Sequence, residues 1–398
     1  MSAAESGTPE VADAEPASTN GSTNGRHDPW LSWARVVALV AIVSIHVFGH
    51  YVLEWGTVSA PEWHVGNLMD ASARFGVPLF VIVSGAALLN PARLQVRNET
   101  LGSFYRRRAA RIGIPLLVWT AFFLCFDRWT TGQPIDVYTF VQGYLWGKPY
   151  YHLYFLYVIA GLYLITPFLR PFLANASRRV VWCASLICLA LAMLDKAQHL
   201  AMGGAGGFNA FSYFVPWIGY YLLGHCLARE FAARRPVLRR HRRTIGYGSA
   251  ACFVGTVSVT AALTWLLFPR LGSGTLSVTY DYFFPLTLLA TVAMAVLVWS
   301  VSTPGSDESA RDAATTVDGQ PEPRRRRPER TLADLTFGIF LLHPIPLELA
   351  KQHGPELPFS TPWLGIGYHY GLLLGLVLLC GIVTYLLIRT PVLRRLVS

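Results

Sequence analysis

Charged side chains are scarce in this chain of 398 residues. Asp, Glu, Lys and Arg together make up 14% of the sequence, whereas 53% of the residues are apolar and the mean hydropathy is +0.38. A soluble globular domain carries about 25% charged residues, because its surface faces water. The composition therefore excludes an ordinary water-soluble fold and indicates a polytopic membrane protein.

Two further features are missing. The six cysteines have neither the spacing of metal ligands nor the pairing pattern of a secreted domain, so we interpret them as reduced packing residues. A signal peptide would begin with basic residues and a short apolar stretch, whereas the first apolar run here starts late and is long. We expect neither a disulfide scaffold nor a cleaved leader.

Long apolar runs are abundant, and each is close to the roughly 20 residues that a helix needs to cross a bilayer. They lie at residues 35–53, 75–90, 112–126, 153–173, 180–194, 208–227, 245–268, 282–301, 332–350 and 363–388. The second, third and fifth runs are short and require flanking residues to span. The predicted fold is all-α, with about ten transmembrane helices.

The basic residues alternate with these runs. If the N-terminus is cytoplasmic, 27 of the 33 Lys and Arg residues fall in segments on the inner side, as the positive-inside rule requires. An even number of spans then places the C-terminus in the cytoplasm as well. The formal net charge of +10 follows from this topology, so nucleic acid is not an expected partner.

The polar stretches define the domain organisation. Residues 1–30 lack apolar periodicity and are expected to form a disordered cytoplasmic tail, and residues 303–330, with prolines and an arginine run, a disordered cytoplasmic linker. Residues 31–302 and 331–392 then form one membrane domain. We expect no soluble domain after the last span, and no internal repeat of fixed period is evident.

Arg35 and His46 are the most informative polar residues, because they flank the stretch Val36–Ile45 within the first apolar run. Eleven helical steps make three turns and about 20°, so both side chains share one face, about 16 Å apart along the axis. With Arg35 at the inner rim, His46 lies near the bilayer middle. An ionisable residue at that depth is a functional candidate. We therefore predict His46 and Arg35 as catalytic residues.

Other candidate residues have ordinary structural interpretations that compete with a functional one. Arg106, Arg107, Arg108 and Arg111 could set the topology or bind the phosphates of a cytosolic donor. The candidates for an acceptor site or pocket are Asn67, Arg74 at the outer rim of the second span, Ser84, His152, Tyr157, Asp281 as an orienter of a histidine, and His343. No metal site is expected.

Four segments in order along the chain resemble motifs of the integral-membrane acyltransferase family 3. They are the Arg35 to His46 spacing, residues 67–85, residues 151–157 with 161–167, and residues 337–344. Within that family the chain is most similar to surface-polysaccharide O-acyltransferases, typified by the enterobacterial common antigen O-acetyltransferase. Family members usually carry an acidic residue three positions before the arginine, where this chain has Ser32. An orienting carboxylate there is missing or relocated.

The resemblance implies a ten-helix enzyme of the bacterial plasma membrane. It would move an acyl group, usually acetyl from acetyl-CoA, to a hydroxyl of a surface polysaccharide, a lipid-linked glycan or a related acceptor, without a metal. Arg35 and His46 match the residues regarded as essential in the family. His46 would act as general base, although a covalent acyl-histidine is an open alternative.

Two other classes of protein compete with this interpretation. A polytopic transporter or flippase would also have about ten spans and intramembrane charge, but the Gly-Pro interruption in the second span has no counterpart in the seventh. A haem or metal protein could use His46 and His50, which are one turn apart. Adjacent-turn histidines, however, lie on the same side of one helix. The acceptor, the acyl chain length and the oligomeric state stay open.

Overall fold

The computed structural model describes residues 28–89, 100–202, 209–233, 235–303, 328–354 and 362–397. These residues form helices and short connections, with no strand among them. The helices are α1 Pro29–Leu53, α2 Ala60–Ala73, α3 Gly76–Leu88, α5 Leu101–Arg108, η1 Ala109–Gly113, α6 Ile114–Thr131, α7 Val137–Trp146, α8 Tyr154–Asn175, α9 Arg178–Met202, η2 Val215–Trp217, α10 Ile218–Ala233, α11 Arg235–Arg240, α12 Arg242–Leu271, α13 Gly274–Thr279, α14 Pro285–Ser302, α16 Pro328–Leu342, α17 Pro344–His353, α18 Pro362–Arg389 and α19 Arg394–Val397. The predicted disordered segments 1–30 and 303–330 lie outside the described residues except at their edges.

The prediction of an all-α polytopic membrane protein is confirmed. Within the described ranges, eight helical segments are long and apolar enough to cross a bilayer, and a ninth results if α16 and α17 count as one span with a 47° bend. The count of ten differs at the run 208–227. That run contributes α10, whose 16 residues cover only about 24 Å. Because α10 packs against α3 and α9 inside the bundle, its length need not match the bilayer.

The three short apolar runs do extend into their flanks. The second run joins α2 and α3 into a segment over Ala60–Leu88, the third joins α5, η1 and α6 over Leu101–Thr131, and the fifth becomes α9. Charged residues hid the full length, since Asp70 and Arg74 lie inside the second segment. Both charges therefore lie within one helical segment that is long and apolar enough to span a bilayer.

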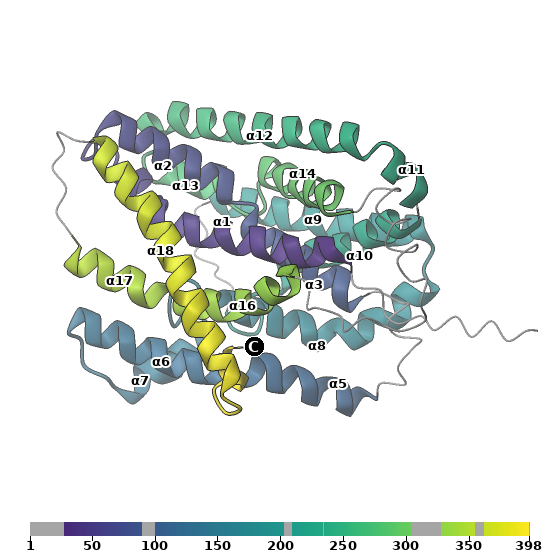
Figure 1. The fold of residues 1–398 in the computed structure, drawn as a ribbon, viewed down its shortest axis with the longest axis horizontal. Helices are drawn as coiled ribbons and strands as arrows, with labels where there is room; N and C mark the ends of the chain where they lie inside the picture. The colour runs from purple at the N-terminus through teal and green to yellow at the C-terminus, as the bar shows by residue number, and fades with distance from the viewer. Residues whose placement is uncertain are drawn as a thin grey trace, which may run out of the picture.

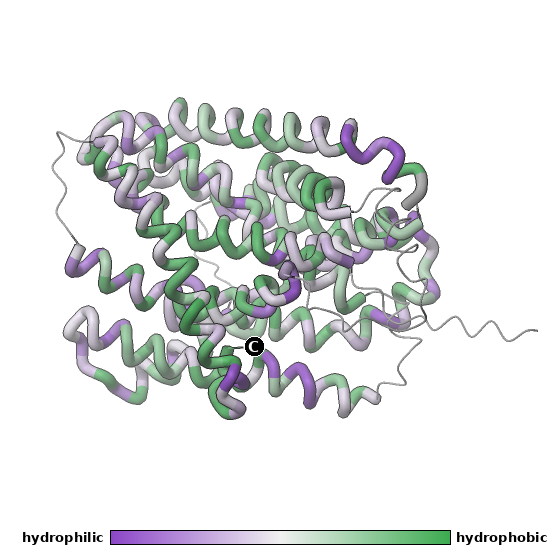
Figure 2. The backbone as a smooth tube through the Cα atoms, viewed as in Figure 1, coloured by the Kyte–Doolittle hydropathy of each residue, from purple (hydrophilic) through white to green (hydrophobic). Residues whose placement is uncertain are grey.

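The helices run roughly along the long axis of the molecule, with α1 in the centre (Figure 1). We call the end with α5 and α11 the basic end and the end with α7 and α17 the far end. Figure 2 shows hydrophilic stretches on α5 and α11, while the middle segments of α1 and α18 are hydrophobic. α1 contacts α2, α3, α14, α16 and α18. A side chain on α1 is therefore surrounded by helices from both halves of the chain.

The cysteines are only partly the packing residues that we predicted. All six lie in described parts of the chain and are free thiols. Cys226 and Cys380 are buried, whereas Cys125 and Cys183 are exposed on the helix surface. Small apolar side chains face lipid as readily as core, so composition alone could not separate these positions.

Two glycines allow α3 and α10 to pack backbone to backbone. A Cβ added to Gly85 would lie 1.9 Å from the carbonyl oxygen of Tyr221, and a Cβ on Gly224 would lie 2.0 Å from that of Ile82. Small residues at such crossings are the usual way for membrane helices to approach closely. The Ser84-Gly85 pair of the sequence thus serves packing through its glycine.

We expect Gly85→Ala to destabilise the protein by about 1–3 kcal/mol, the usual cost of overpacking a tight contact. The midpoint of thermal unfolding in detergent should fall. Gly255→Ala in α12 is the matched control, because a Cβ there meets nothing within 4 Å. Equal midpoints for the two variants would contradict this description of the α3–α10 contact.

Candidate active site

Arg35 and His46 both lie in α1, as predicted. α1 starts at Pro29, so Arg35 lies about 9 Å inside its N-terminal end and His46 about 10 Å before its C-terminal end. Both side chains are half-buried. The pair therefore straddles the middle of the helix, with Arg35 toward the basic end and His46 toward the far end.

The His46 ring is held between two other rings. It stacks on His343 with a centroid distance of 5.4 Å and an angle of 21°, and it contacts Tyr151 at 4.6 Å. His343 occupies the bend between α16 and α17, where Pro344 cannot donate a backbone hydrogen bond. The bend turns the chain past α1 and places the imidazole of His343 against that of His46.

The backbone fixes the tautomer of His343. Its Nδ1 donates to the carbonyl oxygens of Phe340 at 2.8 Å and Ile339 at 3.2 Å, and these oxygens can only accept. The Nε2 atom is consequently a lone-pair acceptor, buried and without a hydrogen-bond partner. Nearby, the buried ring of His152 lies 5.5 Å from His343 in a T-shaped contact. The predicted candidates His152 and His343 thus join His46 in one cluster.

Arg74 was predicted at the outer rim of the second span, and the structure places it within a longer helical segment. It lies where α2 meets α3, in the middle of the segment Ala60–Leu88. Its Nη2 atom is 2.6 Å from Oδ2 of Asp70, whose side chain is only 2% exposed. The Arg74 Nε atom and the Asp70 Oδ1 atom are buried without hydrogen-bond partners. A buried ion pair with spare donor and acceptor atoms is costly, which points to a functional use.

Contacts of α1 with α2 and with the start of α3 place this ion pair opposite the part of α1 that contains His46. A Cβ on Gly66 would lie 2.4 Å from the Cβ of Tyr51, and one on Gly76 would lie 3.1 Å from the Cβ of Ala41. These two contacts bracket the antiparallel pair, so Asp70 and Arg74 lie opposite the stretch that contains His46.

The Arg74 guanidinium packs on the face of an aromatic ring. Its guanidinium carbon lies 4.6 Å from the centroid of the Tyr280 ring. The Tyr280 hydroxyl hydrogen-bonds to the side-chain oxygen of Asn67, and the Asn67 amide donates to the carbonyl oxygen of Ala261 at 2.9 Å. The buried side chain of Asn67 thus fixes the position of Tyr280 against the guanidinium.

A cavity of about 550 Å³ opens at the far end. Its lining residues are Asp127, Thr130, Thr131, Lys148, Pro149, Tyr150, Tyr151, Tyr154, Glu348 and Lys351. Tyr151 belongs both to this lining and to the rings around His46. The imidazole of His46 is therefore one aromatic ring away from the cavity.

The predicted donor arginines lie at the basic end. Arg106, Arg107 and Arg111 are exposed, whereas Arg108 is half-buried, with its guanidinium 5.2 Å from the Phe104 ring centroid and 5.5 Å from that of Tyr163. The chain leaves α5 through the π-helical turn η1, a widened turn that is frequent at functional sites.

Three predicted site residues do not join the His46 cluster. Ser84 lies about 15 Å farther along its segment than Arg74. Tyr157 contacts Thr120 at 3.3 Å between α8 and α6. Asp281 was predicted as an orienter of a histidine, but its carboxylate lies 3.2 Å from Lys196 and accepts from the backbone of Phe283. The described residues contain no group of three or more His, Cys, Asp or Glu side chains that could hold a metal ion.

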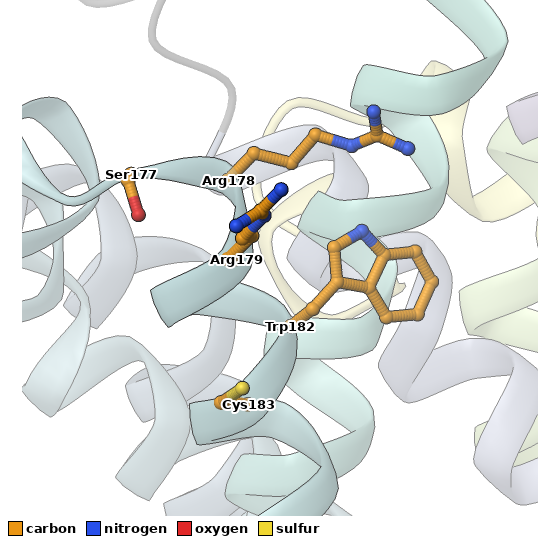
Figure 3. A pocket seen from close by; sticks show the side chains of 5 residues that line it. All are labelled: Ser177, Arg178, Arg179, Trp182 and Cys183. Atoms are coloured by element: carbon orange, nitrogen blue, oxygen red, sulfur yellow. The ribbon is translucent and has the colours of Figure 1, made fainter.

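A second pocket lies at the start of α9 (Figure 3). It is lined by Ser177, Arg178, Arg179, Trp182 and Cys183. Arg178 is paired with Glu230 at 2.5 Å, and the lining contains no histidine. This pocket lacks the residues for acid–base chemistry that surround His46.

Sequence reasoning missed Asp70 as a site residue. The signal was present, since Asp70 and Arg74 are four residues apart and side chains at that spacing meet on a helix. It was lost because the second span was predicted to begin at residue 75. The sequence indicated Tyr151 only as the first residue of the segment 151–157 in the family resemblance.

The comparisons with known proteins identify the family of the chain. Residues 28–387 match the family model of the acyltransferase domain, family 3. Searches of curated proteins and of solved structures return no match. The match covers nearly all of the chain, including every residue of the His46 cluster and the cavity. The chain is therefore an integral-membrane acyltransferase and belongs to the acyltransferase family 3.

Proposed function

We propose that the protein takes an acyl group, usually acetyl, from a cytosolic acyl-CoA and transfers it to a hydroxyl of a surface polysaccharide, a lipid-linked glycan or a related acceptor in the bacterial plasma membrane. One observation carries the proposal. His46 shares a helix face with Arg35, lies on the stretch of α1 opposite the pair of half-buried Arg74 and buried Asp70, and is separated from a polar cavity by a single tyrosine ring. This arrangement supports a base, a cation and an entry for a second substrate in one site.

The donor would bind along α1. Coenzyme A has phosphates at one end and a thioester at the far end of an extended arm, comparable in length to the roughly 16 Å between Arg35 and His46. Guanidinium groups bind phosphate oxygens in a bidentate manner. The exposed arginines of α5 and η1 would hold the phosphates at the basic end, and Arg35 would guide the arm toward His46.

The chemistry needs one proton acceptor and one site for negative charge. His46 would take the proton of the acceptor hydroxyl, whose oxygen then attacks the thioester carbonyl carbon. The carbonyl oxygen becomes an oxyanion, and the spare Nε–H donor of Arg74, held in place by Asp70, would stabilise it. When the carbon–sulfur bond breaks, the thiolate of coenzyme A takes the proton back from His46.

The donor part of the proposal predicts a specific loss of affinity. Arg106→Gln with Arg111→Gln should raise the KM for acetyl-CoA roughly tenfold or more, since a hydrogen bond to a charged group contributes about 1.5–3 kcal/mol. Arg240→Gln with Arg243→Gln removes the same charge from exposed positions at the same end and is the control. If both double variants raise the KM equally, the effect is one of general surface charge and the proposed phosphate site is wrong.

The activity itself is tested with membranes that contain the full chain. Acetyl-CoA labelled in the acetyl group should transfer label to a membrane or glycan fraction as an ester that mild base releases. Membranes without the protein provide the background. Label that remains in acetyl-CoA and free acetate alone would refute transfer to a hydroxyl acceptor.

A further inference from the structure

We infer that the cavity at the far end is the acceptor subsite, and that it binds a neutral, polyhydroxylated sugar unit rather than an acidic sugar or an isoprenoid chain. The inference rests on the proposed function, because it assigns the second substrate of the same reaction. It names what that function leaves open, the chemical class that enters at the far end.

The cavity borders a ring that contacts the base. Tyr151 lines it and its ring centroid lies 4.6 Å from that of His46, and the Tyr150 ring lies 4.6 Å from that of Tyr151. A hydroxyl bound beside Tyr151 is therefore one side chain away from His46, and a shift of the Tyr151 ring brings the two together. The volume of about 550 Å³ lies in the range of small-molecule sites, roughly 300–1,000 Å³.

The charges of the lining cancel. Asp127 and Glu348 supply two carboxylates, and Lys148 and Lys351 supply two ammonium groups. A polyanion such as coenzyme A or an acidic glycan gains most from a site with a net positive charge, which the basic end offers and this cavity does not. A neutral ligand loses nothing in a balanced site. It can also use both kinds of group, since each sugar hydroxyl donates and accepts.

The two threonine hydroxyls of the lining can accept hydrogen bonds from a ligand. Thr130 and Thr131 both donate to the carbonyl oxygen of Asp127, at 3.1 and 2.7 Å, which leaves their oxygen lone pairs for a ligand. An isoprenoid chain would strip water from these groups and from the four charged side chains without replacing any hydrogen bond. The lining therefore disfavours hydrocarbon and favours a polyol.

The aromatic wall is rigid. The Tyr150 ring stacks on Phe123 with a centroid distance of 4.8 Å and an angle of 27°, and Phe123 is fully buried. A fixed ring face offers apolar contact to the C–H side of a sugar at little entropic cost. Polar groups on one side and a ring face on the other form a typical arrangement for an amphipathic sugar unit.

The experiment measures binding to the purified full chain in detergent without acyl-CoA. The probes are maltose, glucuronic acid and farnesol, each followed by saturation-transfer NMR. Maltose should bind, whereas glucuronic acid and farnesol should bind at least about tenfold more weakly. Asp127→Asn with Glu348→Gln should weaken maltose binding about tenfold or more, while Arg178→Gln in the second pocket should leave it unchanged.

If the double variant folds poorly, a single substitution that reverses the preference between the two sugars provides the test. Glu348→Lys gives the lining a net positive charge, so it should bind glucuronic acid better than maltose. Tight binding of farnesol or of glucuronic acid to the wild type, or no binding of maltose, would overturn the inference. In those cases labelled acetyl transfer from membranes can still occur, so the proposed function survives. Loss of all transfer with maltose binding intact would refute the function instead.

Discussion

Replacing His46 with alanine is expected to reduce acyl transfer from labelled acetyl-CoA by about 10²–10⁴-fold, the usual contribution of a general base. No other described group is placed to substitute for it. The Nε2 atom of His343 is an unpartnered acceptor, but His343 is 0% exposed and His152 is 2% exposed, and neither lines the cavity, so neither ring meets a hydroxyl that enters there. The protein should remain folded, because His46 is half-buried and makes ring contacts alone.

His50→Ala is the matched control for this prediction. His50 lies one turn along the same helix, but its ring faces His369 of α18 at 4.8 Å, and its Nδ1 bonds to the carbonyl oxygen of Val47. Loss of that ring should change transfer by only a few fold. If His50→Ala is as inactive as His46→Ala while both proteins are intact, then α1 packing and not the His46 base explains the loss.

Replacing Arg74 with glutamine is the second large effect. Removal of one donor to a developing oxyanion costs about 10²–10³ in kcat, so kcat should fall by that factor while the KM for acetyl-CoA changes little. Arg74→Lys keeps the charge without the planar donors and should recover only part of the rate. A rise in KM at unchanged kcat would place Arg74 in ground-state binding and contradict the proposed role.

Variants of Asp70 distinguish an effect on stability from an effect on the rate of transfer. Asp70→Asn leaves the buried guanidinium without its counter-ion, and breaking a buried pair typically costs about 3–5 kcal/mol. The midpoint of thermal unfolding in detergent should therefore drop. The double variant Asp70→Asn with Arg74→Gln replaces two charges by two amides and should regain most of the stability but none of the lost rate. Recovery of the rate in the double variant would refute a catalytic Arg74.

The sequence predicted the helical content and the face shared by Arg35 and His46, because both follow from apolar runs and helical periodicity. These are local properties, and eleven residues of one helix carry their own geometry. The depth of Arg74 could not be predicted in the same way. The run of apolar residues stops at Arg74. The helical segment, however, begins at Ala60 and contains Arg74 paired with Asp70.

The contacts of His46 lay beyond sequence reasoning for a different reason. Tyr151 and His343 come from segments about 100 and 300 residues away, and their approach depends on the bend at Pro344 and on the packing of α16 against α1. The cavity likewise joins α6, α17 and the turn before α8. The residue pattern of a single helix carries no information about contacts between segments that are far apart in the sequence. The length of the sixth run could not be predicted for a similar reason, because a helix that packs inside the bundle, as α10 does, need not match the bilayer.

Sidedness of the reaction tests most directly whether acyl groups pass from the basic end to the His46 cluster. Acetyl-CoA does not cross membranes, so it can be offered to one face of sealed vesicles. Labelled acetyl-CoA outside everted vesicles, in which the basic end faces outward if it is cytoplasmic as predicted, should label the acceptor in wild type and not in His46→Ala. Intact right-side-out vesicles should show no transfer until they are permeabilised. Efficient labelling of intact right-side-out vesicles, or of everted vesicles with His46→Ala, would contradict the proposed path and base.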